Sequence, residues 1–155
     1  MDRVTKLLKM NRVMTLATSY DNVPRASIVE YSMIGERMMF STHPDSIKCR
    51  NLSANPRISF TVGHMPVYLA VDGTAVEASE KEKEEYIRAM MGVDWRILRI
   101  SGSAYVEDWN KIMIEKYPEF RKLMESGGLK YYKVNFETAY YTEGTSAAEI
   151  IQMGK

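Results

Sequence analysis

The sequence predicts a mainly β fold, an antiparallel β-barrel of six to eight strands with short helices crossing between them. Strand-forming runs recur along the chain and are separated by turn signals such as Asp21-Asn22 and Gly63-His64-Met65-Pro66. Two of the intervening segments carry helix start and stop signals. Gly73 lies inside a long strand-forming run, which is typical of a bulge or bend that lets a sheet curl. Together these features favour a small barrel with helical crossovers.

Length and charge limit the kinds of function that the protein can have. At 155 residues the chain fits one domain, residues 1–155, with a sizeable core. Its 21 basic and 20 acidic residues provide no global field that would hold nucleic acid or anionic lipid. No apolar run reaches the length of a membrane span, and the N-terminus lacks a signal-peptide core, so we expect a cytoplasmic protein. A single cysteine, Cys49, and only two histidines, His43 and His64, predict no disulfide and no metal site.

The first part of the chain reads as a helix followed by a meander of strands. The spacing of Val4, Leu7 and Leu8 predicts one face of a short opening helix. Tyr20–Val23 is expected to form a turn that joins the first two strands into a hairpin. The predicted strands of this part are Val13–Ser19, Pro24–Tyr31, Arg37–Ser41 and Ile58–Val62.

A helix is expected between the third and fourth of these strands. His43-Pro44-Asp45 breaks the strand, because proline fixes its own φ and pushes the preceding residue out of the helical region. Asp45 is the predicted N-cap of a helix from about Ser46 to Ala54. Ile47, Asn51 and Leu52 are its predicted inner face, and Asn55-Pro56 ends it.

The start of this helix is the candidate site. Ser41, Thr42, Ser46 and Lys48 surround a helix N-terminus, where free N–H groups and the helix dipole favour an anion. Hydroxyl groups and one lysine at that place make a phosphate cradle. The same residues also suit an ordinary cap and a solvated surface lysine, and spacing alone leaves both interpretations open.

The second part of the chain alternates long strands with helices. Val67–Ser79 is a predicted strand, and Ser79-Glu80-Lys81-Glu82 is a capping box that starts a helix ending at Gly92. The expected inner face of that helix is Tyr86, Ile87, Met90 and Met91. The remaining predictions are a strand over Arg96–Asp108, a helix over 109–123, a last strand or strand pair over Leu129–Thr142, and a tail, Glu143–Lys155, that forms a small helix or an arm lying on a partner.

Three segments in this order resemble a known family. They are VMTLATSYDNVPRASIVEY, then MMFSTHPDSIKCRNLSANPRISFTV, then a strand with Gly-x-Ala at Gly73. The chain is similar to the FMN-binding split-barrel flavoproteins related to pyridoxamine 5'-phosphate oxidase, closely from Leu7 to Ala78 and loosely in its ending. The resemblance implies a homodimer that holds FMN at its interface.

The resemblance also assigns roles to residues. Lys48 would bind the FMN phosphate as a point charge, with Ser46 and Thr42 donating hydrogen bonds. Ser41 and Thr42 would line the edge of the cofactor. The backbone of Ser27, Ile28 and Val29 would face the isoalloxazine ring, where hydrogen-bond donors tune the reduction of a flavin.

Several positions depart from the family pattern. The phosphate-binding arginine falls on Ser27, and Arg25 on the same strand face is its candidate replacement. A second arginine falls on Ile47, and the glutamine that contacts the ring falls on Tyr68. Nothing after Leu129 matches the substrate segment of the oxidase itself.

The predicted function is therefore an FMN-dependent oxidoreductase that takes hydride from a reduced nicotinamide and passes electrons to an acceptor that the sequence does not identify. A non-catalytic flavin-binding or flavin-sensing protein is one alternative. The same barrel binding a deazaflavin or haem is another.

Overall fold

The computed structural model describes residues 2–91, 118–119 and 128–154. None of the helices in these ranges is long and apolar enough to cross a membrane. The strand predicted over Arg96–Asp108 and most of the helix predicted over 109–123 lie outside the described residues. The elements are α1 (Arg3–Met10), β1 (Val13–Tyr20), β2 (Val23–Ile34), β3 (Arg37–Thr42), α2 (Ile47–Ala54), β4 (Arg57–His64), β5 (Val67–Glu77), α3 (Glu80–Met91), β6 (Lys130–Glu143) and β7 (Glu149–Gln152).

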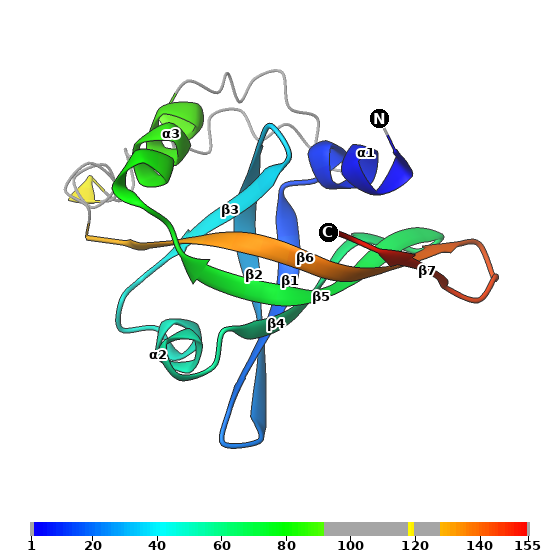
Figure 1. The fold of residues 1–155 in the computed structure, drawn as a ribbon, viewed down its shortest axis with the longest axis horizontal. Coiled ribbons are helices and arrows are strands. Elements are labelled where there is room, and N and C mark those ends of the chain that lie inside the picture. Colours follow the sequence, from blue (N-terminus) through cyan, green and yellow to red (C-terminus); the bar gives the residue numbers. More distant parts are fainter. Residues whose placement is uncertain (1, 92–117, 120–127, 155) are drawn as a thin grey trace.

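The strands form an antiparallel barrel (Figure 1). Their order is β3-β2-β1-β4-β5-β6-β7, and β3 also pairs with β6, so β1 to β6 close on themselves. This confirms the predicted fold class. β7 adds to β6 outside the closed ring through the pairing of Tyr140 with Ile150. The prediction of a helical tail is wrong, because Glu149–Gln152 is extended and finds ladder partners on β6 of its own chain. An arm lying on a partner stays a prediction.

Two local features shape the barrel as the sequence predicts. Asp21 and Asn22 have φ values of 50° and 60°, the left-handed conformation that a two-residue hairpin turn requires. At Gly73 the register between β5 and β6 shifts. A Cβ atom at this position would lie 2.1 Å from the carbonyl oxygen of Asn135, so only glycine allows the two strands to approach so closely.

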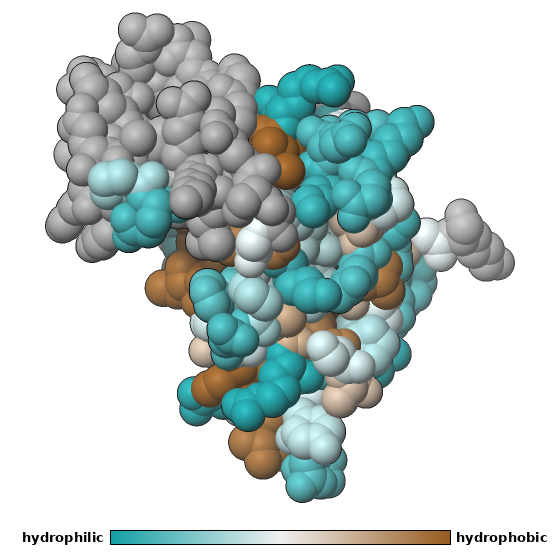
Figure 2. Space-filling view, turned by 90° about the vertical axis from the view of Figure 1, so that its left-hand side faces the viewer, coloured by the Kyte–Doolittle hydropathy of each residue, from teal (hydrophilic) through white to brown (hydrophobic). Residues whose placement is uncertain are grey.

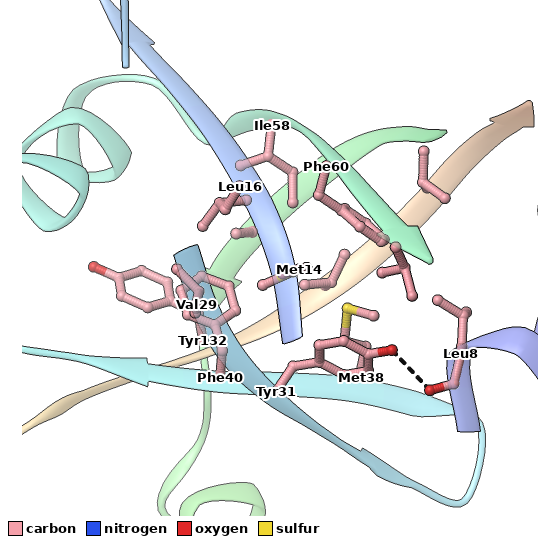
Figure 3. Packing of buried hydrophobic residues seen from close by; sticks show 14 of the residues in the cluster. Leu8, Met14, Leu16, Val29, Tyr31, Met38, Phe40, Ile58, Phe60 and Tyr132 are labelled. Carbon is pink, nitrogen blue, oxygen red and sulfur yellow. Dashed lines mark hydrogen bonds between the residues drawn. The ribbon is translucent and has the colours of Figure 1, made fainter. Parts of the chain in front are cut away.

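The core fills the barrel interior and continues under α1 (Figure 3). Phe40 of β3 and Tyr132 of β6 are cross-strand partners that both point inward, and their rings stack with centroids 5.3 Å apart. Val4 and Leu8 of α1 are buried, which confirms the predicted face of the opening helix. The hydroxyl of Tyr31 donates to the carbonyl oxygen of Leu8 at 2.8 Å, and burial raises the pKa of this tyrosine. α1 therefore closes one end of the barrel.

A second, smaller cluster lies under α3, on the outer side of β3 and β6. Its buried members are Met39, Tyr86, Met90 and Tyr131. The predicted capping box is confirmed, because the N–H of Ser79 donates to Glu82 at 2.8 Å and the N–H of Glu82 donates to Ser79 at 3.3 Å. The predicted burial of Tyr86 and Met90 is confirmed as well, and Ile87 is partly buried. Gly92, the predicted stop, lies outside the described residues.

Candidate functional site

The β3–α2 junction has the local structure of a helix cap. Ser46 is the N-cap: its backbone is extended, and its hydroxyl accepts a hydrogen bond from the N–H of Cys49 at 3.2 Å. The hydroxyl groups of Thr42 and Ser46 lie 3.0 Å apart. The prediction of Asp45 as N-cap is wrong, because the turn holds this residue elsewhere. Its N–H donates to Nδ1 of His43 at 3.2 Å, and its side chain stays exposed.

Polar contacts fasten α2 to β1. Nδ2 of Asn51 donates to the hydroxyl of Thr18 at 3.1 Å, and Nδ2 of Asn55 donates to the carbonyl oxygen of Ser19 at 3.2 Å. Cys49 and Leu52 are buried below these contacts. Ile47, predicted on the same face as Asn51 and Leu52, does not share their burial, since it is 40% exposed at the first turn. The helix start is thus fixed in place, with one apolar residue facing outward.

The helix start retains hydrogen-bond donors. Hydrogen bonds within the described ranges account for the N–H groups of Ser46, Cys49 and Arg50, which leaves those of Ile47 and Lys48 for a ligand or water. The first turn holds no acidic residue. Lys48 is half-buried on that turn, and no carboxylate in the described part of the chain pairs with it. These features fit a phosphate group, which needs N–H donors and a cation.

The barrel is split next to this junction. β2 pairs with β3 only from Tyr31 to Ile34, whereas Ser41 and Thr42 of β3 pair with β6. The N–H of Tyr31 donates to the carbonyl oxygen of Arg12, so its backbone groups face β1. Because these groups alternate along a strand, those of Ser27 and Val29 also face β1, and those of Ile28 face the open edge. Of the three residues expected to present their backbone to a ring, Ile28 has its N–H and C=O groups directed to this open edge.

Side chains on β2 divide between the interior and the outer face. Ser27 lies opposite Leu16 and Val29 opposite Met14, so both face inward. Ile28 faces outward and is 78% exposed. Arg25 lies opposite Thr18, the residue that Asn51 of α2 contacts. This pairing places Arg25 on the face of the hairpin that carries α2.

Tyr68 and Ser41 lie at different places around the split. On the outer face, cross-strand pairs run from Ile28 through Thr15 and Thr61 to Ala70, and Tyr68 lies two residues before Ala70 on β5. Small side chains therefore separate the open edge from Tyr68. Ser41 lies opposite Tyr131 and, two residues from Met39, on the face of β3 that packs under α3. Thr42, Ser46 and Lys48 thus all lie at the β3–α2 junction, and Ile28 and Tyr68 share the outer face of the sheet.

Comparison with protein families identifies the chain. The family model described as pyridoxamine 5'-phosphate oxidase matches residues 1–142. The chain belongs to this family. No curated protein sequence matches it.

Solved structures share the fold of this pyridoxamine 5'-phosphate oxidase family member at low sequence identity. General Stress Protein 26 from Bacillus anthracis is 17% identical with a TM-score of 0.64, and the match covers 97% of this chain and 95% of that one. A FAD-binding protein from Mesorhizobium loti is 19% identical with a TM-score of 0.53, covering 88% and 87%. A heme binding protein from Mycobacterium smegmatis is 15% identical with a TM-score of 0.66, covering 94% and 55%. At these identities the likeness concerns the fold alone.

Sequence reasoning missed one element of the site in this family member. It is the pair of Asn51 and Thr18, which joins α2 to the hairpin from 33 residues away in sequence. Polar residues at inner positions are a signal for this pair, because a buried amide needs a partner.

Proposed function

We propose that the protein is an FMN-binding flavoprotein and an FMN-dependent oxidoreductase that takes hydride from a reduced nicotinamide. Family membership supports flavin chemistry in general, and one solved structure of this fold is a FAD-binding protein. The observation that carries the choice of a phosphate-bearing flavin is the start of α2. There, the backbone N–H groups of Ile47 and Lys48, the hydroxyl pair of Thr42 and Ser46, and the Lys48 side chain belong to one junction, and the first turn of the helix holds no acid.

The residues have distinct shares in this proposal. Lys48 and the N–H groups of the first turn hold the phosphate, and Arg25 adds a second cation from the hairpin. The open edge at Ile28 offers a backbone donor and acceptor to the ring, with Tyr68 on the same outer face. FMN, when bound, supplies the acceptance of a hydride or of single electrons. The protein's part is to hold the phosphate, orient the ring and tune it by hydrogen bonds.

Other ligands have less support among the described residues. Haem is the ligand named for one structure of similar fold. In this chain His43 lies in the turn between β3 and α2, where its Nδ1 accepts from the N–H of Asp45, and His64 ends β4, where its Nδ1 lies 2.8 Å from the carbonyl oxygen of Met65.

A deazaflavin or a purely sensing role would use the same cradle. Turnover with reduced nicotinamides distinguishes an oxidoreductase from a sensor, and the cytoplasmic location stays a prediction.

We also propose a homodimer, with the ligand at its interface. Exposed apolar side chains lie on the outer surface of the β1–β2 hairpin and at the start of α2. Figure 2, which views the side where α2 lies in Figure 1, shows hydrophobic patches among hydrophilic ones in the lower half of the molecule. The large apolar residues of β1, β2 and α2 that are exposed are Val13, Tyr20, Val23, Ile28 and Ile47. A second copy would cover them and the open edge of β2 together.

Light scattering tests the homodimer. The expected mass is twice the 17.8 kDa of one chain. A monomer that nevertheless binds FMN tightly would contradict a ligand site at the interface.

Flavin titration tests the cofactor. The purified protein should take up FMN and show its visible absorption band. Lys48→Ala should weaken FMN binding by about one to two powers of ten, because a charge-assisted hydrogen bond contributes roughly 1.5–3 kcal/mol. Riboflavin, which lacks the phosphate, should bind equally to both proteins.

Lys81→Ala is the matched control. Lys81 is the second residue of α3, as Lys48 is of α2, and it is exposed. This variant should bind FMN like the wild type. Protein that takes up no FMN refutes the proposal. Equal weakening of FMN and riboflavin by Lys48→Ala refutes the assignment of the phosphate to α2.

A further inference from the structure

A buried hydrogen bond ties the first turn of α2 to the core of the barrel. The thiol of Cys49 lies 3.2 Å from the hydroxyl of Tyr132 on β6, although the two residues are 83 positions apart in the sequence. Both are buried, with exposed fractions of 4% and 2%. The ring of Tyr132 is itself held by stacking on Phe40 of β3, its cross-strand partner. The bond therefore joins the start of the helix to a well-packed point of the barrel wall.

The packing of the ring does not account for the hydroxyl of Tyr132. A phenylalanine would keep the stacking on Phe40 and would bury no polar atom. The phenol is the stronger donor of the pair, since a thiol is a weak donor and a weak acceptor. Burial raises the pKa of Tyr132, and the hydrogen bond to Cys49 raises it further, so the phenol keeps its proton at neutral pH. The contact with α2 is what the hydroxyl contributes.

The first turn of α2 depends on this contact more than the rest of the helix does. Of residues 47–49, all of which the structure describes, Cys49 alone is buried, whereas Ile47 is 40% exposed and Lys48 is half-buried. The side-chain bonds from Asn51 and Asn55 to β1 fasten the helix beyond its first turn. The first turn also carries the charge of Lys48, which the helix dipole disfavours. A bond from this turn to the core offsets that disadvantage.

We infer that Tyr132 is a positioning residue that, through the thiol of Cys49, holds the first turn of α2 in the conformation whose N–H groups and Lys48 bind a phosphate. The inference rests on the proposed flavin site and identifies what keeps the phosphate cradle formed before the ligand binds. Because this effect acts through the cradle, it concerns FMN and not riboflavin, which lacks the phosphate.

Flavin titration of Tyr132→Phe tests this role, with Tyr31→Phe as the matched control. Each variant removes one buried phenol hydroxyl, but that of Tyr31 bonds to Leu8 at the α1 end of the barrel. Tyr132→Phe should weaken FMN binding about twofold to fivefold, because a smaller fraction of the protein has its first turn in the binding conformation. Riboflavin should bind to Tyr132→Phe as it does to the wild type. Tyr31→Phe should leave the binding of both flavins unchanged.

Chemical labelling of Cys49 provides a second measurement, which does not depend on the reactions of a flavin. Cys49 is the only cysteine of the chain, so the reagent dithiobis(nitrobenzoate) reports on this thiol alone. Because the thiol is buried, it reacts when the first turn opens. Without ligand, Tyr132→Phe should be labelled about twofold to fivefold faster than the wild type, and Tyr31→Phe at the wild-type rate. Saturating FMN should slow the labelling of the wild type more than saturating riboflavin does.

The outcomes separate this inference from the proposed function. Wild-type protein that binds neither flavin refutes the proposed function, and this inference with it. Where the wild type binds FMN, three results refute the inference only: unchanged FMN binding by Tyr132→Phe, an equal loss of FMN and riboflavin, or labelling of Cys49 at the wild-type rate.

Two substitutions of Cys49 keep the inference testable if Tyr132→Phe does not fold. Cys49→Ser retains a partner for the phenol, and Cys49→Ala does not. Cys49→Ser should therefore bind FMN more tightly than Cys49→Ala, with riboflavin binding alike in the two variants. Equal FMN binding by both variants would refute the inference.

Discussion

The two helices that follow barrel strands begin with similar residues and differ in what satisfies their first turns. α2 starts after Ser46 with Ile-Lys-Cys, and α3 starts after Ser79 with Glu-Lys-Glu. Both serine hydroxyls accept a hydrogen bond from the N–H three residues later. In α3 the third residue is Glu82, which accepts from the N–H of Ser79 in return. In α2 the third residue is Cys49, whose thiol lies 3.2 Å from the hydroxyl of Tyr132 in the core.

This difference separates a structural cap from a binding site. In α3, Glu80 and Glu82 of the first turn place negative charge at the positive end of the helix dipole. The first turn of α2 has no acid and adds the positive charge of Lys48, which the dipole disfavours. Because no acidic side chain offsets the positive charge at the start of α2, a bound anion would stabilise it. The contrast supports a ligand at α2 and none at α3.

Ile47→Glu should have the largest effect, because it gives α2 the acid that α3 has at the same position. A carboxylate at this point repels a phosphate by roughly 3 kcal/mol at about 6 Å and an effective dielectric constant of about 20, so FMN binding should weaken by about a hundredfold. The protein without ligand should gain stability, by about 0.3–1 kcal/mol, from the helix dipole. Flavin titration and urea unfolding measure the two effects.

Ile47→Gln is the control for size and exposure. It introduces no charge, so it should bind FMN nearly as the wild type does. Equal loss of FMN binding in both variants would mean that the side chain of Ile47, and not the charge at the helix start, matters for the ligand.

The sequence predicted most of the fold because its signals are local. Asp21-Asn22 dictates a tight hairpin, Gly73 marks the point where β5 and β6 approach most closely, and Ser79 with Glu82 announces α3. Each of these depends on residues close in sequence. The strand pattern predicted a barrel, but not that it closes through β3 and β6, because these strands lie far apart in the sequence.

The errors arose where tertiary contacts choose between equivalent local solutions. Asp45 and Ser46 are both good caps, and the turn that engages His43 with the N–H of Asp45 selects Ser46. The tail Glu149–Gln152 has no strong pattern of its own, and the free edge of β6 recruits it as a strand. In the candidate site, the proximity of Thr42 and Ser46 was predictable, because the two residues are four apart in sequence. The bond between Asn51 and Thr18 was not predictable, because it depends on how α2 packs on the β1–β2 hairpin.

Removing each N-cap hydroxyl in turn should have an intermediate effect on stability and FMN binding. Ser46→Ala and Ser79→Ala should each destabilise the ligand-free protein by about 1 kcal/mol, since each leaves one helix N–H group without its partner. Urea unfolding measures this loss. Only Ser46→Ala should also weaken FMN binding, because only Ser46 belongs to the cradle. A loss of FMN binding of the same size in Ser79→Ala would show that the binding defect follows from general destabilisation.

The smallest effect concerns the pH dependence of stability at the start of α3, where Ser79 and Glu82 hydrogen-bond to each other's N–H groups. The hydrogen bond from Lys133 and the N–H of Ser79 lower the pKa of Glu82 from 4.5 to about 2. A carboxylate whose pKa is lower in the folded state stabilises the fold above its ordinary pKa, and this contribution is lost as the pH falls from about 4.5 to 2. Glu82→Gln removes the titrating group, so its stability should decline less steeply than that of the wild type across this window. Glu80→Gln, which changes the 87% exposed acid of the same turn, should follow the wild type. Thermal unfolding at a series of pH values measures the slopes, and parallel curves for Glu82→Gln and the wild type would mean that α3 does not depend on the charge of Glu82.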